Sequence, residues 1–423
     1  MFASGRVKLA ARLLFKMNLQ RAPIVGFGKT EAPEHTVRRL EAALGNLYRY
    51  TYEEGKTSED LCWSGLYIDE LDFEGAGKGI TPILCKASAL AETAERLAIR
   101  DLTSLPGYLK AHQRDVPNAL KIESLLTHVA SAGPDIIRQI KDTELAQHWV
   151  DATSLLSGKT LKVPIGYIHG ISGTNGLASG NRLEEAIVQA TNEVYERRAA
   201  ITVLRGKLVM PTFDITTIDN LVIRRQYEAL TQKGIEITIK DFSFGGILPC
   251  VGVYFVNRNV SPDLQLHHIL NVGTSFDREE AIMRAFTEFA QGRKFENRPL
   301  KEGFERLKCL GDNTDHFLAL FKYGYVSYTH ADFLKEGDVV PFERGQIYTD
   351  CMDEIERAKD IFRELGLDYL VADFTDPRIG FPVAQAIVPG YSDILPYHPR
   401  SSRVLLRGWS RDDVVGVYDA PQE

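Results

Sequence analysis

Residues 171–198, ISGTNGLASGNRLEEAIVQATNEVYERR, decide how the rest of the chain is arranged. The segment begins as a glycine-rich loop and continues as a helix, which Asn181, a favourable N-cap residue, is expected to open. Because a helix advances about 100° per residue, its polar residues fall within an arc of roughly 160°; they are Asn181, Glu185, Glu193, Glu196 and Arg197. Such a face is most often exposed to solvent, and alone it does not predict a functional site.

Two further segments have the same form, a glycine-containing loop that leads into a helix with a polar face. They are residues 75–96, GAGKGITPILCKASALAETAER, and residues 271–293, NVGTSFDREEAIMRAFTEFAQGR. The polar residues are Ser88, Glu92, Glu95 and Arg96 in the first segment and Arg284, Glu288, Gln291 and Arg293 in the second. Three such units favour one shared site over three independent solvated faces.

The chemistry that fits these residues is a metal-bridged polyphosphate site. Carboxylates alone repel a triphosphate, whereas Mg²⁺ takes oxygen ligands and bridges glutamate to phosphate. Arg96, Arg197, Arg284 and Arg293 would then contact phosphate oxygens through their forked guanidinium groups. Loop amides at the helix N-termini would add neutral donors.

Together the three segments resemble the signature of the YcaO superfamily, whose enzymes depend on ATP and Mg²⁺ and activate the backbone amides of peptides. The resemblance extends from about residue 25 to about residue 395. The family pattern Ser/Ala-x-x-x-Glu-x-x-Glu-Arg matches Ser88, Glu92, Glu95 and Arg96; Asn-x-x-x-Glu followed by Glu-x-x-Glu-Arg matches Asn181, Glu185, Glu193, Glu196 and Arg197; and Arg-x-x-x-Glu-x-x-Gln-x-Arg matches Arg284, Glu288, Gln291 and Arg293.

The resemblance implies roles for these residues. The expected Mg²⁺ ligands are Glu92, Glu95, Glu193 and Glu196, and the expected catalytic residues are Arg197, Arg284 and Glu288. The expected ATP-binding residues are Lys29, Thr36, Ser88, Arg96, Asn181, Glu185, Arg197, Arg284, Glu288, Gln291 and Arg293.

Lys29 and Thr36 enter this set for a separate reason. Residues 26–40, GFGKTEAPEHTVRRL, contain the GKT ending of a P-loop, but Pro23 occupies the position where that motif requires its first glycine. In YcaO proteins a lysine near this point and a Ser or Thr seven residues later contact the nucleotide, and Lys29 and Thr36 have this separation. The alternative is a surface loop followed by a helix cap.

The second half of the chain contains a repeat. Residues 225–255 and 356–388 each read as helix, glycine, strand and strand. The duplication predicts two αβ lobes around a shared cleft. The resemblance implies that the fold is an α+β, YcaO-type fold and that this central cleft binds the nucleotide. The expected domains are a basic amphipathic arm (1–22), a YcaO domain (23–400) with a helical insertion at about 97–160, and a tail (401–423); a strand is expected at 163–169.

Composition limits the classes of function. The formal net charge of -7 gives no support to a nucleic-acid binder, and no apolar run approaches the roughly 18 residues of a membrane helix. The five cysteines are scattered without a CxxC pair, which predicts a reducing, cytoplasmic environment. The arm at residues 1–22 could serve a dimer contact, so a homodimer is expected.

The reaction implied by the resemblance is O-phosphorylation of a peptide or protein backbone amide, with ATP converted to ADP and phosphate. Since the chain does not end in the Pro-x-Pro-x-Pro tail of azoline-forming members, thioamide formation with an external sulfur donor and a TfuA-like partner is expected first. The alternatives are an azoline- or amidine-forming cyclodehydratase and a non-catalytic ATP-binding partner of a peptide- or ribosomal-protein-modifying enzyme. A carboxylate–amine ligase fits the acids and arginines but not the order of the motifs.

Overall fold

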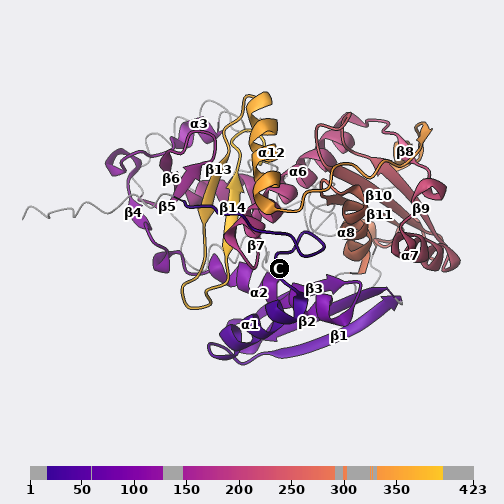
Figure 1. Cartoon of the computed structure of the whole chain (residues 1–423), viewed down its shortest axis with the longest axis horizontal. Coiled ribbons are helices and arrows are strands. Elements are labelled where there is room, and N and C mark those ends of the chain that lie inside the picture. The colour runs from indigo at the N-terminus through magenta and orange to yellow at the C-terminus, as the bar shows by residue number, and fades with distance from the viewer. Residues whose placement is uncertain are drawn as a thin grey trace, which may run out of the picture.

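The computed structural model describes residues 17–58, 60–126, 146–290, 299–302, 324, 326 and 331–393. Its strands form three β-sheets, and the long helix α6 (Leu183–Gly206) lies between two of them (Figure 1). One side of α6 packs on β7 (Leu177–Ser179) and β14 (Val383–Ile387), and the other on β10 (Cys250–Asn257) and β11 (His268–Thr274).

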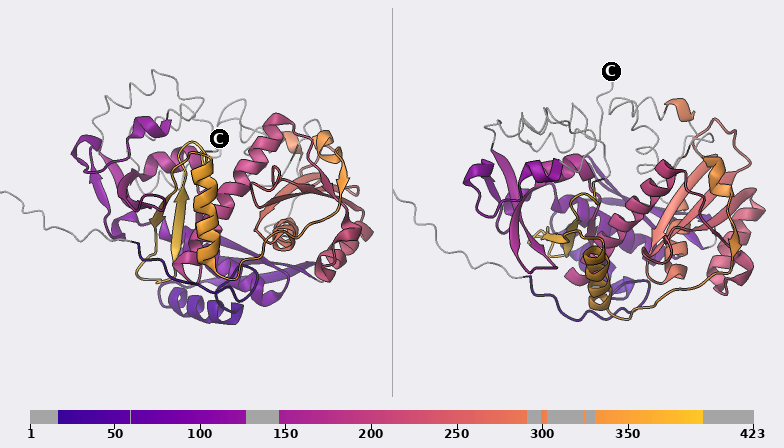
Figure 2. Two further views of the ribbon diagram at one scale, coloured as in Figure 1. Left: turned by 45° about the horizontal axis from the view of Figure 1, so that its top comes forward. Right: turned by 90° about the horizontal axis from the view of Figure 1, so that it is seen from above.

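The first sheet is an antiparallel meander near the N-terminus. It consists of β1 (Thr51–Ser58), β2 (Leu61–Ile68) and β3 (Phe73–Gly79), with α2 (Pro82–Ala98) on β2 and β3 and α1 (Pro33–Gly45) packed against α2. This unit lies across the ends of the other two sheets, at the bottom in Figure 1 and again in the left view of Figure 2. The sequence pattern did not predict this third αβ unit.

The second sheet has five strands in the order β11-β10-β9-β8-β12. Its remaining members are β8 (Thr212–Phe213), β9 (Ile235–Asp241) and β12 (Val339–Val340), and its helices are α7 (Leu221–Gln232) and α8 (Arg278–Ala290). Alternate residues of β10 serve two hydrophobic cores, because side chains of a strand alternate between its faces. Tyr254 and Val256 pack in the core around α6, whereas Val253 and Phe255 pack in the core with α7 and α8.

The third sheet contains β4 (Leu109–Ala111), β5 (Gln147–Ser154), β13 (Leu370–Asp373), β14 and β7 in that order, with β6 (Thr160–Pro164) paired to β5. Its helices are α5 (Ile165–Ser172), α12 (Cys351–Glu364) and the short α3 (Ile122–Leu126). Short 3-10 helices occupy Asp69–Leu71, Leu102–Ser104, Gln113–Asp115, Ile215–Thr217 and Asp332–Lys335.

The predicted duplication is confirmed. One copy is α7-β9-β10 in the five-stranded sheet, and the other is α12-β13-β14 in the six-stranded sheet. In both copies the two strands pair antiparallel, with Asp241 opposite Val251 in the first and Asp373 opposite Ala384 in the second. The α+β fold class is therefore confirmed, with the two predicted lobes built on these two sheets.

Two predictions of local structure are wrong. The described part of the expected helical insertion at about 97–160 includes β5, which pairs with β13, so its end belongs to the six-stranded sheet. The strand expected at 163–169 is instead largely the helix α5, which begins after Pro164 and ends at Gly173 with a positive φ of 59°. Short apolar runs of this kind fit a buried helix and a buried strand equally well.

Residues 17–22, the described end of the predicted arm, pack onto the domain. The backbone N–H of Gln20 donates to Glu184 of α6 at 2.6 Å, and the Arg21 guanidinium pairs with Asp353 of α12. Residues 1–16 and the predicted tail 401–423 lie outside the described residues.

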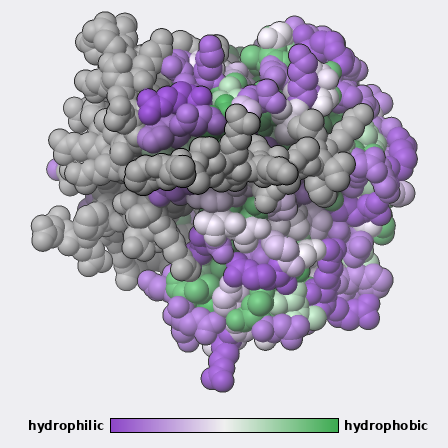
Figure 3. Space-filling model, turned by 90° about the vertical axis from the view of Figure 1, so that its left-hand side faces the viewer, coloured by the Kyte–Doolittle hydropathy of each residue, from purple (hydrophilic) through white to green (hydrophobic). Residues whose placement is uncertain are grey.

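The surface is polar where the figures show it. On the face in Figure 3, hydrophilic side chains predominate over the described residues, and apolar residues form small separate patches. Among the helices described, none combines the length and apolar character that a membrane span requires.

Candidate functional site

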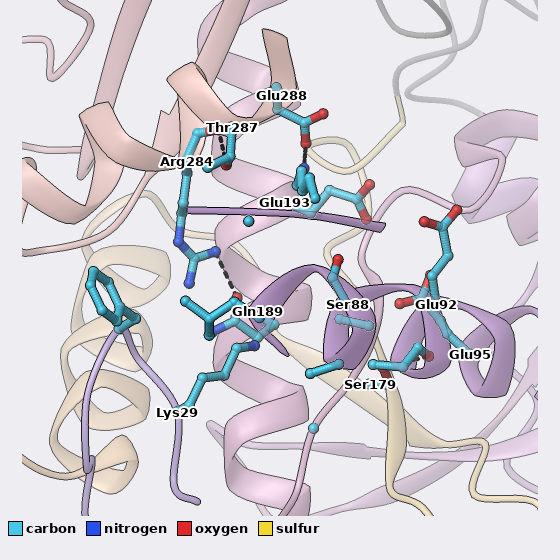
Figure 4. A pocket seen from close by; sticks show the side chains of 18 of the residues that line it. Lys29, Ser88, Glu92, Glu95, Ser179, Gln189, Glu193, Arg284, Thr287 and Glu288 are labelled. Carbon is cyan, nitrogen blue, oxygen red and sulfur yellow. Dashed lines mark hydrogen bonds and ion pairs between the residues drawn. The ribbon is translucent and has the colours of Figure 1, made fainter. Parts of the chain in front are cut away.

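A pocket of about 1070 Å³ lies where the three-stranded sheet, α6 and the five-stranded sheet meet. Its walls come from residues 25–36, β3, α2, β7, α6, β11 and α8. The polar residues predicted from the sequence line this pocket, apart from two that lie outside the described residues. Those labelled in Figure 4, among them Ser88, Glu193 and Arg284, project from different elements toward one space. The predicted residues that line the pocket are Lys29, Thr36, Ser88, Glu92, Glu95, Arg96, Asn181, Glu185, Glu193, Glu196, Arg197, Arg284 and Glu288.

Strand β3 reaches the pocket because its glycines let α2 pack directly on it. An added Cβ would clash with Thr93 at Gly75 and with the backbone of Cys85 at Gly77 or Gly79. The alternate residues Glu74, Ala76 and Lys78 point the other way and line the pocket. The alternation in FEGAGKG thus fixes which side chains enter the site.

Helix α2 supplies two carboxylates and an arginine. Arg96 Nε lies 3.9 Å from Glu92 Oε1, and Arg96 Nη1 lies 3.6 Å from Glu95 Oε1. Burial raises the pKa of Glu95 to about 8, although Arg96 acts in the opposite direction, and the carboxylates of Glu193 and Glu92 raise it further. Glu193 belongs to α6, so carboxylates of two helices lie close enough to repel one another.

Helix α6 repeats this arrangement. Arg197 Nη2 lies 3.5 Å from Glu193 Oε1, and Arg197 Nε lies 3.8 Å from Glu196 Oε1. Glu193 also accepts a 2.9 Å hydrogen bond from the backbone N–H of Gly176. Burial, together with the charge of Glu193, raises the pKa of Glu196 against the opposing effect of Arg197. Helices α2 and α6 therefore each present to the pocket two carboxylates and an arginine, and in each helix burial raises the pKa of one of these carboxylates.

These carboxylates fit Mg²⁺ by their chemistry and charge. Among the described residues that line the pocket, nine are glutamates and five are lysines or arginines. These carboxylates repel one another and would also repel a polyphosphate. Divalent cations that take oxygen ligands would reduce both the repulsion between carboxylates and the repulsion between carboxylates and phosphate. Within the described residues, no group of three or more acidic, histidine or cysteine side chains is yet gathered around one point; the glutamates of α2 and α6 are instead paired with Arg96 and Arg197.

A second part of the pocket is built on Glu185, which is 1% exposed. Thr30 donates to its carboxylate from the backbone N–H at 2.9 Å and from Oγ1 at 2.7 Å, and Lys29 Nζ lies 3.5 Å away. Asn181 donates to the same carboxylate and accepts a 2.7 Å hydrogen bond from Thr36. Lys29 and Thr36 are thus part of the site and not only a surface loop and a helix cap.

The expected N-cap role of Asn181 is wrong by one residue. The N-cap is Arg182, which makes no side-chain capping bond, and α6 begins at Leu183. The Asn181 side chain instead accepts a hydrogen bond from Thr36 of α1 and donates one to Glu185, so it does not cap the helix backbone.

Helix α8 lines the opposite wall. Arg284 donates through Nε and Nη2 to Glu280 at 3.1 and 2.9 Å and through Nη1 to Gln189 of α6 at 2.6 Å (Figure 4). Glu288, one turn further along, forms an ion pair with Lys78 of β3. Gln291 and Arg293, also predicted for this site, lie outside the described residues.

The sequence analysis missed several lining residues. Gln189 is four residues from both Glu185 and Glu193, and Glu280 is four residues before Arg284, so helical periodicity alone could have identified both. Lys78 lies between glycines in a strand, and no family pattern marked it. Burial lowers the pKa of its ammonium group to about 8, opposed by the negative charges of Glu196 and Glu92.

Comparison with known proteins identifies the family of the chain. Residues 76–392 match the family model described as YcaO cyclodehydratase, ATP- and Mg²⁺-binding. The chain is 28% identical over 344 residues to an uncharacterised protein of Methanothermobacter thermautotrophicus, covering 74% of the chain and 80% of that protein. It is 29% identical over 239 residues to an uncharacterised protein in the tfuA 3′ region of Rhizobium leguminosarum bv. trifolii, covering 51% of the chain and 54% of that protein, so it spans about half the length of this relative.

A solved structure shares the fold. The structure of YcaO from Methanopyrus kandleri bound with AMPPCP and Mg²⁺ has a TM-score of 0.60 at 18% identity, covering 88% of this chain and 95% of that one. The family match confirms ATP and Mg²⁺ as the predicted cofactors. Since the family model covers residues 76–392, the chain belongs to the YcaO family of ATP- and Mg²⁺-dependent enzymes that modify peptide backbones.

Proposed function

We propose that this enzyme transfers the γ-phosphoryl group of ATP to the oxygen of a peptide backbone amide and thereby forms a thioamide with an external sulfur donor. The observation that carries the proposal is the convergence of three acidic helices, α2, α6 and α8, with Arg96, Arg197 and Arg284 in one pocket. Phosphoryl transfer needs positioning and neutralisation of charge, and this pocket supplies groups for both.

The residues divide into two groups by position. Glu92, Glu95, Glu193 and Glu196 would hold Mg²⁺, which when bound neutralises phosphate charge and bridges it to the protein. Lys29, Thr36, Asn181 and Glu185 form the hydrogen-bonded cluster that would bind the nucleotide. Ser88 and Arg96 of α2 also line the pocket and would contact the nucleotide.

Arg197, Arg284 and Glu288 are the residues proposed to act on the reacting groups. The two guanidinium groups would neutralise the negative charge that develops on the β–γ bridging oxygen as this oxygen leaves with ADP. An amide oxygen is a poor leaving group, and its phosphorylation allows departure as phosphate after a nucleophile has attacked the carbonyl carbon. Glu288 would orient the cationic groups next to it.

The nucleophile is proposed to come from outside the protein. Cys62, Cys85, Cys250 and Cys351 are buried, and none of these four lines the pocket. An external sulfide would therefore supply the new C–S bond. The relative encoded in a tfuA 3′ region supports a TfuA-like partner for this step.

The test is mass spectrometry of a candidate peptide after incubation with the enzyme, Mg²⁺, ATP and sulfide. Oxygen-to-sulfur exchange adds about 16 Da, whereas closure of an azoline ring removes about 18 Da (atomic mass arithmetic for the covalent products). A gain that requires both ATP and sulfide supports the proposal. A loss of water without sulfide would instead establish the cyclodehydratase alternative.

Two expectations accompany the proposal. The free, buried state of the four described cysteines is compatible with the expected cytoplasmic location. The homodimer stays a prediction, to be measured by sedimentation of the purified chain.

A further inference from the structure

Lys78 is the pocket cation that the sequence motifs do not account for. The other cations among the described lining residues are Lys29, Arg96, Arg197 and Arg284, and each of these was predicted from the sequence to contact nucleotide or phosphate. Lys78 lies in the glycine-containing start of residues 75–96, which forms the end of β3, where Gly77 and Gly79 hold the strand against α2. Its backbone is therefore fixed, and only its side chain extends into the pocket.

The ion pair of Lys78 differs from those of the three pocket arginines in the elements that it connects. Arg96, Arg197 and Arg284 each pair with carboxylates of their own helix. Lys78 pairs with Glu288, so this contact joins β3 to α8 across the pocket. About a quarter of its side-chain surface (24%) is exposed, and the side chain lines the pocket, so it can be reached by a ligand there.

The charges around Lys78 place it between the two functional parts of the site. Its negative neighbours include Glu196 of α6 and Glu92 of α2, which are proposed metal ligands, and Glu288 of α8. Its positive neighbours are Arg284 of α8 and Arg197 of α6. In Figure 4 a dashed line marks the ion pair of Glu288, whereas Arg284 extends in another direction, toward Gln189.

A triphosphate between these groups would bring its last phosphate to the metal-binding carboxylates and its earlier part to the cluster of Lys29 and Glu185. The position between Glu196 and Arg284 is then that of the γ-phosphate. A lysine ammonium acts there as a compact charge with three donors and no fixed plane, so it can follow a phosphoryl group that moves between two oxygens.

We infer that Lys78 is a catalytic residue that leaves Glu288, binds the γ-phosphoryl group and keeps this contact during transfer. The inference rests on the proposed function. In the step, the bond from the γ-phosphorus to the β–γ bridging oxygen breaks, with its electron pair going to ADP. A bond forms from the same phosphorus to the peptide amide oxygen, and Lys78 neither gains nor loses a proton.

The test compares two defined ligands, Mg·AMP-PNP and Mg·ADP, by calorimetry on the full chain. Lys78→Met should weaken Mg·AMP-PNP by about tenfold or more, the effect of losing one charge-assisted contact, and change Mg·ADP by less than about threefold. Lys86→Met is the matched control, because Lys86 of α2 pairs with Glu41 at 2.6 Å, has 30% side-chain exposure and does not line the pocket. This control should leave both affinities unchanged.

Three results separate the explanations. Unchanged affinity for Mg·AMP-PNP in Lys78→Met overturns the inference, and so does an equal loss for both nucleotides. A purely structural role would lower the thermal midpoint without changing the preference for AMP-PNP over ADP. If Lys78→Met does not fold, Lys78→Gln is judged by the same two affinities. Absence of Mg²⁺-dependent nucleotide binding in the wild type would instead contradict the proposed function itself.

Discussion

Arg284 of α8 donates a 2.6 Å hydrogen bond to the side-chain oxygen of Gln189 on α6, and this bond joins two pocket-lining helices that are far apart in the sequence. The Nη2 of Arg284 donates a 2.9 Å hydrogen bond to Oε1 of Glu280. The Nε2 of Gln189 is buried and has no hydrogen-bond partner within the described residues. A ligand oxygen next to this nitrogen would complete its hydrogen bonding, as expected for a site built to receive a polar ligand.

Replacement of Gln189 by leucine is the first prediction. Gln189→Leu keeps similar volume but removes the acceptor that orients Arg284, so the dissociation constant of Mg·ATP should rise about tenfold. Calorimetry at fixed Mg²⁺ measures this change. Gln232→Leu, at the exposed end of α7, is the control and should bind as the wild type does. Equal affinities for Gln189→Leu and the control would contradict a role of Gln189 in the site.

The second prediction concerns the dependence of binding on metal. The double variant Glu193→Gln and Glu196→Gln removes two negative charges from α6 without changing its shape. Mg·ATP should bind at least about tenfold more weakly, because charged ligands of the metal are lost. Metal-free ATP should bind no more weakly than to the wild type, since the repulsion is reduced. Glu228→Gln on the exposed face of α7 is the control, and a weakening of both forms in the double variant would contradict a metal-bridged site.

The third prediction concerns pH. Glu354 on α12 is 7% exposed, and burial followed by the charge of Glu280 raises its pKa to about 8, while Arg284 acts in the opposite direction. The folded protein therefore keeps this proton to a higher pH than the unfolded chain, whose carboxyl titrates near 4.5. The free energy of unfolding should fall as pH rises between these values, by at most about 1.4 kcal/mol per pH unit from this group.

Glu354→Gln removes this titration. Its free energy of unfolding minus that of the wild type should increase from pH 5.5 to pH 8, as measured by urea denaturation without nucleotide. Asp353→Asn, the adjacent and half-exposed residue that pairs with Arg21, controls for loss of a charge on the same helix. Parallel pH profiles for Glu354→Gln and the wild type would show that this carboxyl does not titrate in the predicted range.

The fourth prediction tests the packing of β3 on α2. Gly77→Ala places a Cβ against the backbone of Cys85 and Ala89, so we expect a loss of about 1–3 kcal/mol in the free energy of unfolding. Gly45→Ala at the end of α1 meets no atom within 4 Å and should be neutral or slightly stabilising. Chemical denaturation of the two variants provides the comparison; equal stabilities would mean that β3 can move away from α2 without cost.

The sequence predicted the residues of the site better than it predicted the secondary structure outside the three motif-bearing segments. Helical periodicity is local, so Glu185, Glu193 and Arg197 could be placed on one face from spacing alone, and the structure brings them to one pocket. The convergence of the three helix faces on one site could be predicted only because three motifs occur together in a given order. Strand β5 was missed although it pairs with β6, the next strand in the chain; only its second pairing, with β13, joins segments distant in the sequence. Asn181 was assigned a cap because its competing partner, Thr36, comes from another element.

The most direct test of the account is a crystal structure of the chain with AMP-PNP and Mn²⁺, collected at a wavelength where manganese gives an anomalous signal. The account predicts manganese peaks that join phosphate oxygens to carboxylates of both α2 and α6, with Glu95 and Glu193 among the ligands. Nucleotide bound elsewhere, or bound in the pocket while these carboxylates remain paired only with Arg96 and Arg197, would contradict it.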